Sequence, residues 1–142
     1  MNLSKPIPAV SRVVVARVER AAIETWDNEA APGVSWRTLI SGDRTPTNEL
    51  SAGLCLIEPG GELTLHRHAQ AEVYHFVAGS GQMNVSGEVF DVGAGDTVFV
   101  PGDAWHSFSN VGEEVVRIFY CFPADSFHEV VYHYPDGSTW HA

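Results

Sequence analysis

From residue 51 onward, short apolar segments alternate with glycine-rich turns, and this pattern constrains the fold more than any other feature of the sequence. No stretch in this part of the chain has the apolar repeat of an amphipathic helix, so each segment is predicted to be a β-strand. The predicted strands cover residues 54–57, 63–68, 72–77, 82–85, 88–92, 97–100, 105–110 and 115–122. Many short strands joined by tight turns predict an all-β sandwich or barrel.

The first third of the chain is less regular. Residues 1–10 have the composition of a loose arm, and the apolar run 13–18 is compatible with either a strand or a short helix. A length of 142 residues predicts one domain. We divide it into an N-terminal arm with strands (1–48), a barrel core (49–123) and a C-terminal segment over the barrel mouth (124–142).

Charge and cysteine usage narrow the classes of function. The formal net charge of −10 disfavours binding to nucleic acid and mildly favours metal ions or cationic ligands. No apolar run is long enough to span a membrane, and the N-terminus has no secretion signal. Cys55 and Cys121 stand alone in the sequence, which predicts reduced thiols and a cytoplasmic location.

The segment 60–74 concentrates residues that bind metals. Alternate side chains share one face of a strand, so His66 and His68 are expected to point the same way, as are Glu72 and Tyr74 on the next strand. Two imidazoles and a carboxylate can supply three ligands to one divalent ion, with Mn²⁺, Fe²⁺, Ni²⁺ and Zn²⁺ as candidates. A further histidine, His106, follows the strand and turn at 97–105.

These residues resemble the two sequence motifs of the cupin superfamily. The first motif is matched by Gly60, His66, His68, Glu72 and Gly79. The second is matched by Gly95, Pro101, His106 and Asn110, but Asp103 stands where its second glycine is expected, with Gly102 one place early. The resemblance implies a double-stranded β-helix, or jelly-roll, barrel with an N-terminal extension. It also implies that His66, His68, Glu72 and His106 bind one divalent transition metal ion.

A narrower resemblance is to the small single-domain dimethylsulfoniopropionate lyases, carried by residues 32–37 and 122–130 in addition to the motifs. In that family the metal binds the substrate carboxylate, a tyrosine removes the adjacent proton, and dimethyl sulfide leaves to give acrylate. The resemblance implies Tyr74 as the base and Tyr132 as a second pocket tyrosine. Arg67 departs from the family pattern, which has an aromatic residue between the histidines.

A sulfonium cation can also be held by aromatic faces, for which Tyr120, Phe99 and Phe108 are candidates.

Other functions fit the same motifs. Related small cupins transfer a methylthio group from methylthioxylulose 5-phosphate to a thiol, which here would be Cys121 pointing into the barrel. That phosphorylated substrate needs cationic partners, for which the candidates are Arg37, Arg67, Arg117 and His133. A sugar-phosphate isomerase and a binding protein without catalysis are further alternatives. Each takes a small-molecule ligand.

A jelly roll leaves sheet edges and an apolar face to be covered, which predicts a homodimer. The apolar run 13–18 is the candidate contact.

Overall fold

The computed structural model describes residues 13–26 and 31–142, and nearly all of its regular structure is β-strand. The strands are β1 (Glu24–Thr25), β2 (Val34–Ile40), β3 (Ser51–Ile57), β4 (Glu62–His66), β5 (Glu72–Ala78), β6 (Ser80–Val85), β7 (Glu88–Gly93), β8 (Thr97–Val100), β9 (His106–Ser109), β10 (Val116–Phe122), β11 (Tyr132–His133) and β12 (Thr139–Trp140). Two single-turn 3₁₀ helices, η1 (Val18–Arg20) and η2 (Phe127–Glu129), are the helical elements of the described residues.

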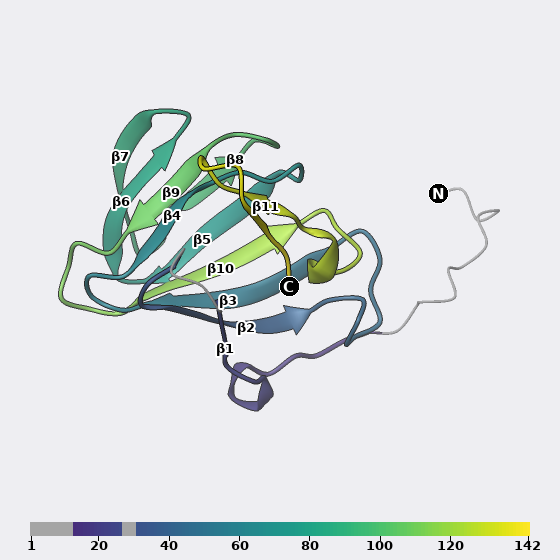
Figure 1. Ribbon diagram of the computed structural model, residues 1–142. Helices are drawn as coiled ribbons and strands as arrows, with labels where there is room; N and C mark the ends of the chain where they lie inside the picture. The colour runs from purple at the N-terminus through teal and green to yellow at the C-terminus, as the bar shows by residue number, and fades with distance from the viewer. Residues whose placement is uncertain (1–12, 27–30) are drawn as a thin grey trace, which may run out of the picture.

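Ten of the strands form two antiparallel sheets that face each other across the core, and β11 and β12 form a separate two-stranded sheet (Figure 1). The larger sheet has the order β1-β2-β3-β10-β5-β8, and the smaller has the order β4-β9-β6-β7. Strands adjacent in a sheet are mostly distant in sequence, as in a jelly roll. The all-β jelly-roll prediction is therefore confirmed.

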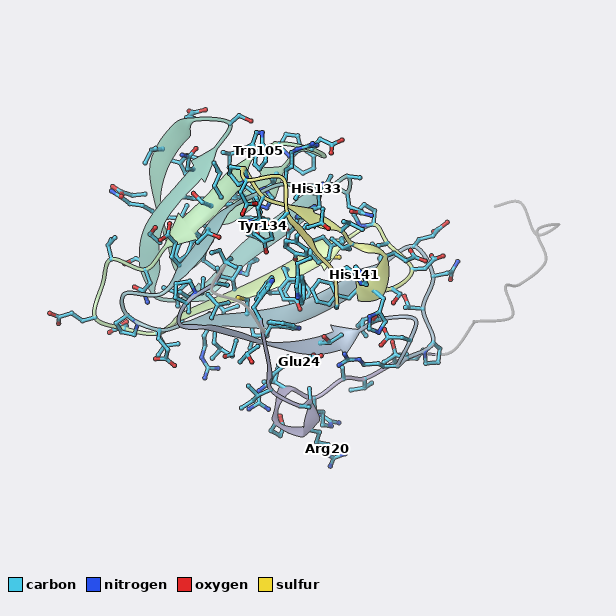
Figure 2. All side chains as sticks on the ribbon, viewed as in Figure 1. Arg20, Glu24, Trp105, His133, Tyr134 and His141 are labelled. Atoms are coloured by element: carbon cyan, nitrogen blue, oxygen red, sulfur yellow. The ribbon has the colours of Figure 1, made fainter. Side chains whose placement is uncertain are left out.

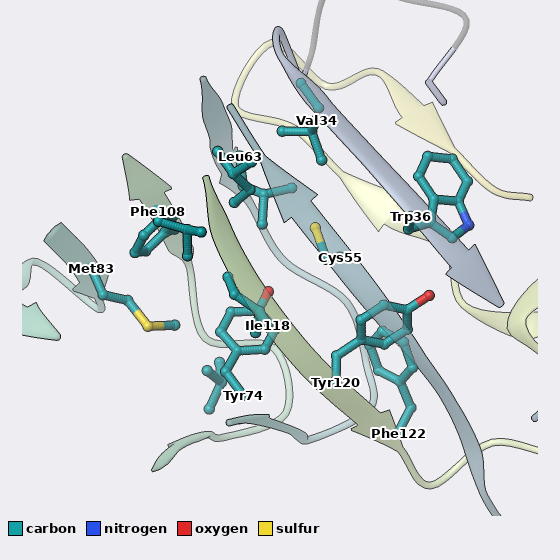
Figure 3. Close-up of a cluster of buried hydrophobic side chains, with 14 of the residues drawn as sticks. Val34, Trp36, Cys55, Leu63, Tyr74, Met83, Phe108, Ile118, Tyr120 and Phe122 are labelled. Atoms are coloured by element: carbon teal, nitrogen blue, oxygen red, sulfur yellow. The ribbon is translucent and has the colours of Figure 1, made fainter. Parts of the chain in front are cut away.

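Alternating burial along the strands places the core between the sheets. In β10, Ile118 and Phe122 are fully buried, whereas Phe119 is 38% exposed. Ile118 lies opposite Cys55 of β3 and Phe76 of β5. Figure 3 shows this interior with its buried side chains. Inward side chains of paired residues on neighbouring strands thus form rows across the larger sheet, and these rows make up the inner wall of the barrel.

The β6–β7 hairpin turns at Ser86 and Gly87, which have φ angles of 52° and 85°. A two-residue turn with both φ angles positive matches the twist of the flanking strands. The predicted hairpin at this dipeptide is therefore present.

The apolar run 13–18 differs from its prediction. Residues 13–17 form neither a strand nor a helix, and η1 begins only at Val18. Val13 and Val15 are 92% and 69% exposed, because no strand of the described chain lies beside them to pair with. Among the described residues, no helix is long and apolar enough to cross a membrane.

Candidate metal centre and cavity

Three buried histidines and a buried carboxylate meet at one point inside the barrel. His66 ends β4, His68 follows it, Glu72 begins β5 and His106 begins β9. The ligand atoms of the three histidines lie within 4.8 Å of one another. The predicted common orientation of His66 and His68 is confirmed, and the paired register of β4 and β9 places His106 directly opposite His66.

Each histidine ring is fixed by a backbone carbonyl two residues away. The Nδ1 atoms of His66, His68 and His106 lie 2.6, 2.9 and 2.9 Å from the carbonyl oxygens of Thr64, Gln70 and Ala104, respectively. With Nδ1–H donating to a carbonyl, each ring leaves its Nε2 lone pair free. This outer-sphere hydrogen bond is the usual arrangement of a metal-binding histidine.

Glu72 completes the cluster. Its Oε2 lies 3.0 Å from His68 Nε2 and 3.5 Å from His106 Nε2. Burial acts to raise the pKa of Glu72, but the nearby imidazoles of His106 and His68 outweigh burial and lower it. Burial, together with the neighbouring His106, lowers the pKa of His66 well below its usual value. A neutral imidazole at His66 and an ionised carboxylate at Glu72 are the protonation states that a metal requires of its ligands.

A buried polar atom without a partner supports the same interpretation. His106 Nε2 makes no hydrogen bond within the described protein, and an unsatisfied buried nitrogen is costly. A divalent cation would use this lone pair and those of His66 and His68. The donor set of three imidazoles and one carboxylate fits a first-row transition ion and does not select one.

The cluster opens onto a narrow cavity of about 20 Å³, which is room for about one water molecule. Its walls are mostly aromatic. The lining residues are Trp26, Trp36, Cys55, Leu63, His66, Glu72, Tyr74, Ile118, Tyr120, Phe127 and Tyr132.

All three predicted pocket tyrosines line this cavity and are buried. Tyr74 lies two residues after Glu72 on the same face of β5, and burial and the Glu72 carboxylate raise its pKa well above the usual value. The ring of Tyr132 lies 5.1 Å from that of His66 and 5.2 Å from that of His68, measured between centroids. Tyr120 packs over Gly53, where a Cβ atom would lie 2.3 Å from the tyrosine hydroxyl. Glycine at that position therefore makes room for Tyr120.

The two cysteines are arranged differently from the expectation. Cys121 lies between the inward residues Tyr120 and Phe122, so its thiol is on the outer face of β10. Cys55 on β3 instead lines the cavity, and burial raises the pKa of its thiol. Residues 51–57 have no polar–apolar alternation that would have marked Cys55, and its inward position follows from the pairing of β3 with β10, which sets it opposite Ile118.

The predicted cationic contacts also lie outside the cavity. Arg37 points to the outer face of β2, where its Nη1 donates to the carbonyls of Val18 and Ala21 at 2.9 and 2.8 Å. Arg67 alternates away from the flanking histidines and forms an ion pair with Asp103 at 3.2 Å.

The remaining candidates lie elsewhere too. Arg117 is exposed on the outer face of β10, and His133 pairs through its backbone with Arg67. Figure 2 labels His133 among the side chains of the C-terminal segment. Phe99 is 65% exposed, and Phe108 packs against Phe76 in the core, so neither can contact a ligand in the cavity.

Sequence reasoning missed the two tryptophans of the cavity. Trp26 and Trp36 pack edge to face with ring centroids 4.5 Å apart, and Trp140 lies 4.8 Å from Trp26. Trp36 could have been identified from the alternation in β2, which buries every second residue at its start. No local signal marks Trp26 or Trp140, because tertiary contacts alone bring them to the barrel.

Comparison with known proteins gives consistent matches. A family profile described as Cupin_2, cupin domain, matches residues 53–123. The chain is 35% identical over 101 residues to the dimethylsulfoniopropionate lyase DddW of Ruegeria pomeroyi, covering 71% of this chain and 66% of that protein. It is 35% identical over 68 residues to a 5-nitrosalicylic acid 1,2-dioxygenase of Bradyrhizobium, covering 48% of this chain and 33% of that protein. The matched segment thus spans less than two thirds of either relative.

Two solved structures share the fold. The polyketide cyclase RemF of Streptomyces resistomycificus superposes with a TM-score of 0.71 at 18% identity, over 79% of this chain and 80% of that one. A cupin-2 domain of Rhodospirillum rubrum superposes with a TM-score of 0.68 at 25% identity, over 78% of this chain and 74% of that one. The similarity to these structures concerns the barrel.

Proposed function

The chain belongs to the cupin family, and from this we propose that it is a metal-dependent carbon–sulfur lyase acting on dimethylsulfoniopropionate or a close analogue. The observation that carries the proposal is the placement of Tyr74 on the same strand face as Glu72, in a cavity that reaches the histidine cluster at His66. The identity to the Ruegeria lyase supports the choice among cupin reactions.

In the proposed reaction, His66, His68, Glu72 and His106 hold the ion. A divalent cation there would neutralise the substrate carboxylate, acidify the adjacent C–H bond and favour the ionised form of the nearby Tyr74 phenol. The phenolate oxygen of Tyr74 then accepts the proton from the α carbon. The C–H electron pair becomes the new carbon–carbon double bond, and the bond from the β carbon to sulfur breaks with its electrons on sulfur. The products are acrylate and dimethyl sulfide, with one proton left on the enzyme.

Tyr132 and Tyr120 shape the rest of the cavity. Tyr132, from the C-terminal segment, packs against two of the three histidines. The walls exclude water from the reacting atoms, which strengthens every charge interaction inside. Aromatic faces are also suitable neighbours for a sulfonium cation.

The charge of the cavity favours this substrate over a phosphorylated one. Within the described part of the chain, no arginine or lysine lines the cavity, and Glu72 adds a negative charge. A phosphate dianion would find no cationic partner there. The thiol that methylthio transfer requires would have to be Cys55, since Cys121 faces outward. Both observations weigh against the methylthioxylulose 5-phosphate and sugar-phosphate alternatives.

Three finer proposals accompany the reaction. The single domain is divided at residues 48 and 123, so that the proposed barrel core contains the matched segment 53–123. The chain forms a homodimer through residues 13–18, where Val13 and Val15 are exposed. A monomer by light scattering at working concentration would contradict the dimer.

A cytoplasmic location is supported by free Cys55 and Cys121.

The test of the proposed reaction is release of dimethyl sulfide from dimethylsulfoniopropionate. Purified protein would be loaded with Mn²⁺, Fe²⁺, Ni²⁺ or Zn²⁺, with headspace gas chromatography for the sulfide and liquid chromatography for acrylate. We expect equal amounts of both products with at least one ion. Protein that binds metal but releases no sulfide with any of the four ions would contradict the proposal. Methylthio transfer from methylthioxylulose 5-phosphate to an added thiol would establish the alternative.

A further inference from the structure

The cavity is closed by residues that come from outside the two sheets. Trp26 precedes β2, Phe127 belongs to η2, and Tyr132 belongs to β11. In Figure 1 the C-terminal segment runs across the front of the barrel, with β11 in front of the strands that carry the site. A volume of about 20 Å³ holds about one water molecule, and even a small carboxylate substrate is several times larger. Movement of part of this closure would give a substrate more room beside His66 and Glu72.

The first half of the C-terminal segment is firmly attached to the barrel. Gly42 N donates to Asp125 O at 2.8 Å, and Ser51 Oγ donates to Ala124 O at 2.8 Å. Phe127 N donates to Ser41 Oγ at 3.0 Å, and an ion pair joins His128 to Asp43 at 3.0 Å. Val130, just beyond η2, is fully buried. Residues 124–130 therefore move only if several hydrogen bonds and core contacts break together.

The second half is attached much more weakly. Strands β11 and β12 form a hairpin whose backbone hydrogen bonds are mostly its own. In the described part of the chain, the hairpin is joined to the barrel by only two backbone hydrogen bonds. Arg67 N donates to His133 O at 3.0 Å, and His133 N donates to Arg67 O at 2.8 Å. Its other attachments include ring contacts, chiefly Tyr132 on the histidines and Trp140 on Trp26.

We propose that the β11–β12 hairpin (residues 132–140) is a lid that opens as a unit at Val131, and that its closure brings Tyr132 onto His66 and His68. The isolated Arg67–His133 bridge is the latch. Opening breaks these two backbone hydrogen bonds and the contact between His128 Nδ1 and Ala142 O (2.6 Å), and it exposes several rings, while η2 and both sheets stay in place. The aromatic wall that Tyr132 completes is then formed only when the lid is closed. The proposal holds whichever reaction the site performs.

Cys55 provides a reporter that does not depend on activity. Its thiol lines the cavity and is buried, so a small alkylating reagent reaches it only when the cavity opens. Cys121 is partly exposed and would react first, so the experiment uses the full chain with Cys121→Ser. Iodoacetamide labelling of Cys55 would be followed by peptide mass mapping.

Two variants change the latch in opposite directions. His133→Pro removes the N–H that donates to Arg67, and its preceding residue is already extended, as proline requires. We expect labelling of Cys55 to rise about fivefold, the equivalent of one net hydrogen bond. Arg67→Cys with His133→Cys places two thiols on directly paired antiparallel residues, within disulfide range. Oxidation should slow labelling of Cys55 at least tenfold, and reduction should restore it.

Val116→Ala is the control for global unfolding. Val116 is fully buried at the start of β10, and its truncation should lower the melting temperature without increasing the labelling of Cys55. Equal labelling rates in the oxidised and reduced double variant would overturn the lid. So would labelling that rises with Val116→Ala at least as much as with His133→Pro, because Cys55 would then be exposed by unfolding. If the disulfide does not form, the labelling rates of Cys55 in His133→Pro and Val116→Ala are compared instead. A larger increase with His133→Pro supports the lid.

Discussion

The barrel wall and the segments that close it are built on different principles. In the wall, every second residue of β5 and β10 points inward, and pairing between strands fixes which side chains share a level. The closing rings, Trp26, Tyr132 and Trp140, lie on two-residue strands or beside them, and ring contacts with one another and with the barrel hold them. The wall therefore sets the chemistry of the site rigidly, whereas the closure can change without disturbing the sheets.

The largest expected effect comes from the wall. His106→Ala removes one of three histidine nitrogens that lie within 4.8 Å of one another. Loss of an outer-sphere partner alone typically costs about 10–100-fold in metal affinity, and loss of a ligand should cost more. We expect most bound metal and all measurable turnover to be lost, with metal content checked by mass spectrometry of the purified protein. His75→Ala is the matched control, because His75 lies on the same sheet as Glu72 and contacts Thr97 outside the cluster. Equal metal content in the two variants would disprove the site.

The sequence predicts the wall well because strand alternation is a local property. The spacing of His66, His68 and Glu72, together with the glycine turns, is sufficient to place these ligands on one face of their strands. The same rule applied to 116–122 places Cys121 on the outward face with Arg117, whereas Cys55 lies in a stretch without alternation. Arg37 and Arg67 alternate away from the cavity, so the error there came from choosing residues by charge without applying the strand register.

The closure could not be predicted in this way. Trp26 follows a two-residue strand, and β11 and β12 are also two residues long, so neither has enough length to show a period. Their positions follow from long-range ring contacts, such as that between Trp26 and Tyr132 at 5.6 Å. Family resemblance alone predicts Tyr132 as a pocket residue. Its contact with two ligand histidines is a finding of the structure.

A smaller effect, still in the wall, is expected from Tyr74→Phe. The substitution removes one oxygen from a buried side chain that lines the cavity and leaves the four metal-binding residues in place. A positioned base contributes about 10²–10⁴-fold in rate, so turnover should fall by that factor while the metal stays bound. Steady-state release of dimethyl sulfide, with metal content measured in the same sample, tests this. Tyr134→Phe, the same substitution in the β11–β12 hairpin, is the control. Turnover unchanged by Tyr74→Phe would exclude Tyr74 as the base.

Substitutions in the barrel wall and in the closing hairpin should also differ in their effect on the free energy of unfolding. Phe76 is fully buried and packs against Phe108, so Phe76→Ala should lower the free energy of unfolding by about 3–5 kcal/mol. Trp140 is only partly buried and lies on the hairpin, so Trp140→Ala should cost less than half as much. Labelling of Cys55 should show the reverse order, rising more with Trp140→Ala. Urea unfolding of both variants supplies the first measurement. A loss with Trp140→Ala as large as that with Phe76→Ala would mean that the hairpin unfolds with the barrel.

The smallest effect should come from the outer face of the wall. Cys121→Ser exchanges sulfur for oxygen at a partly exposed position whose inward neighbours, Tyr120 and Phe122, are unchanged. Turnover as a lyase should stay within about tenfold, a barrier change below ~1.4 kcal/mol. Cys55→Ser places a hydroxyl in the cavity wall beside Ile118 and should disturb the site more, since a buried hydroxyl needs a partner that the apolar wall does not offer. Activity that disappears with Cys121→Ser and survives Tyr74→Phe would mean that a thiol on the outer face takes part in the chemistry. That result would reverse the assignment of inner and outer faces on which the proposed lyase depends.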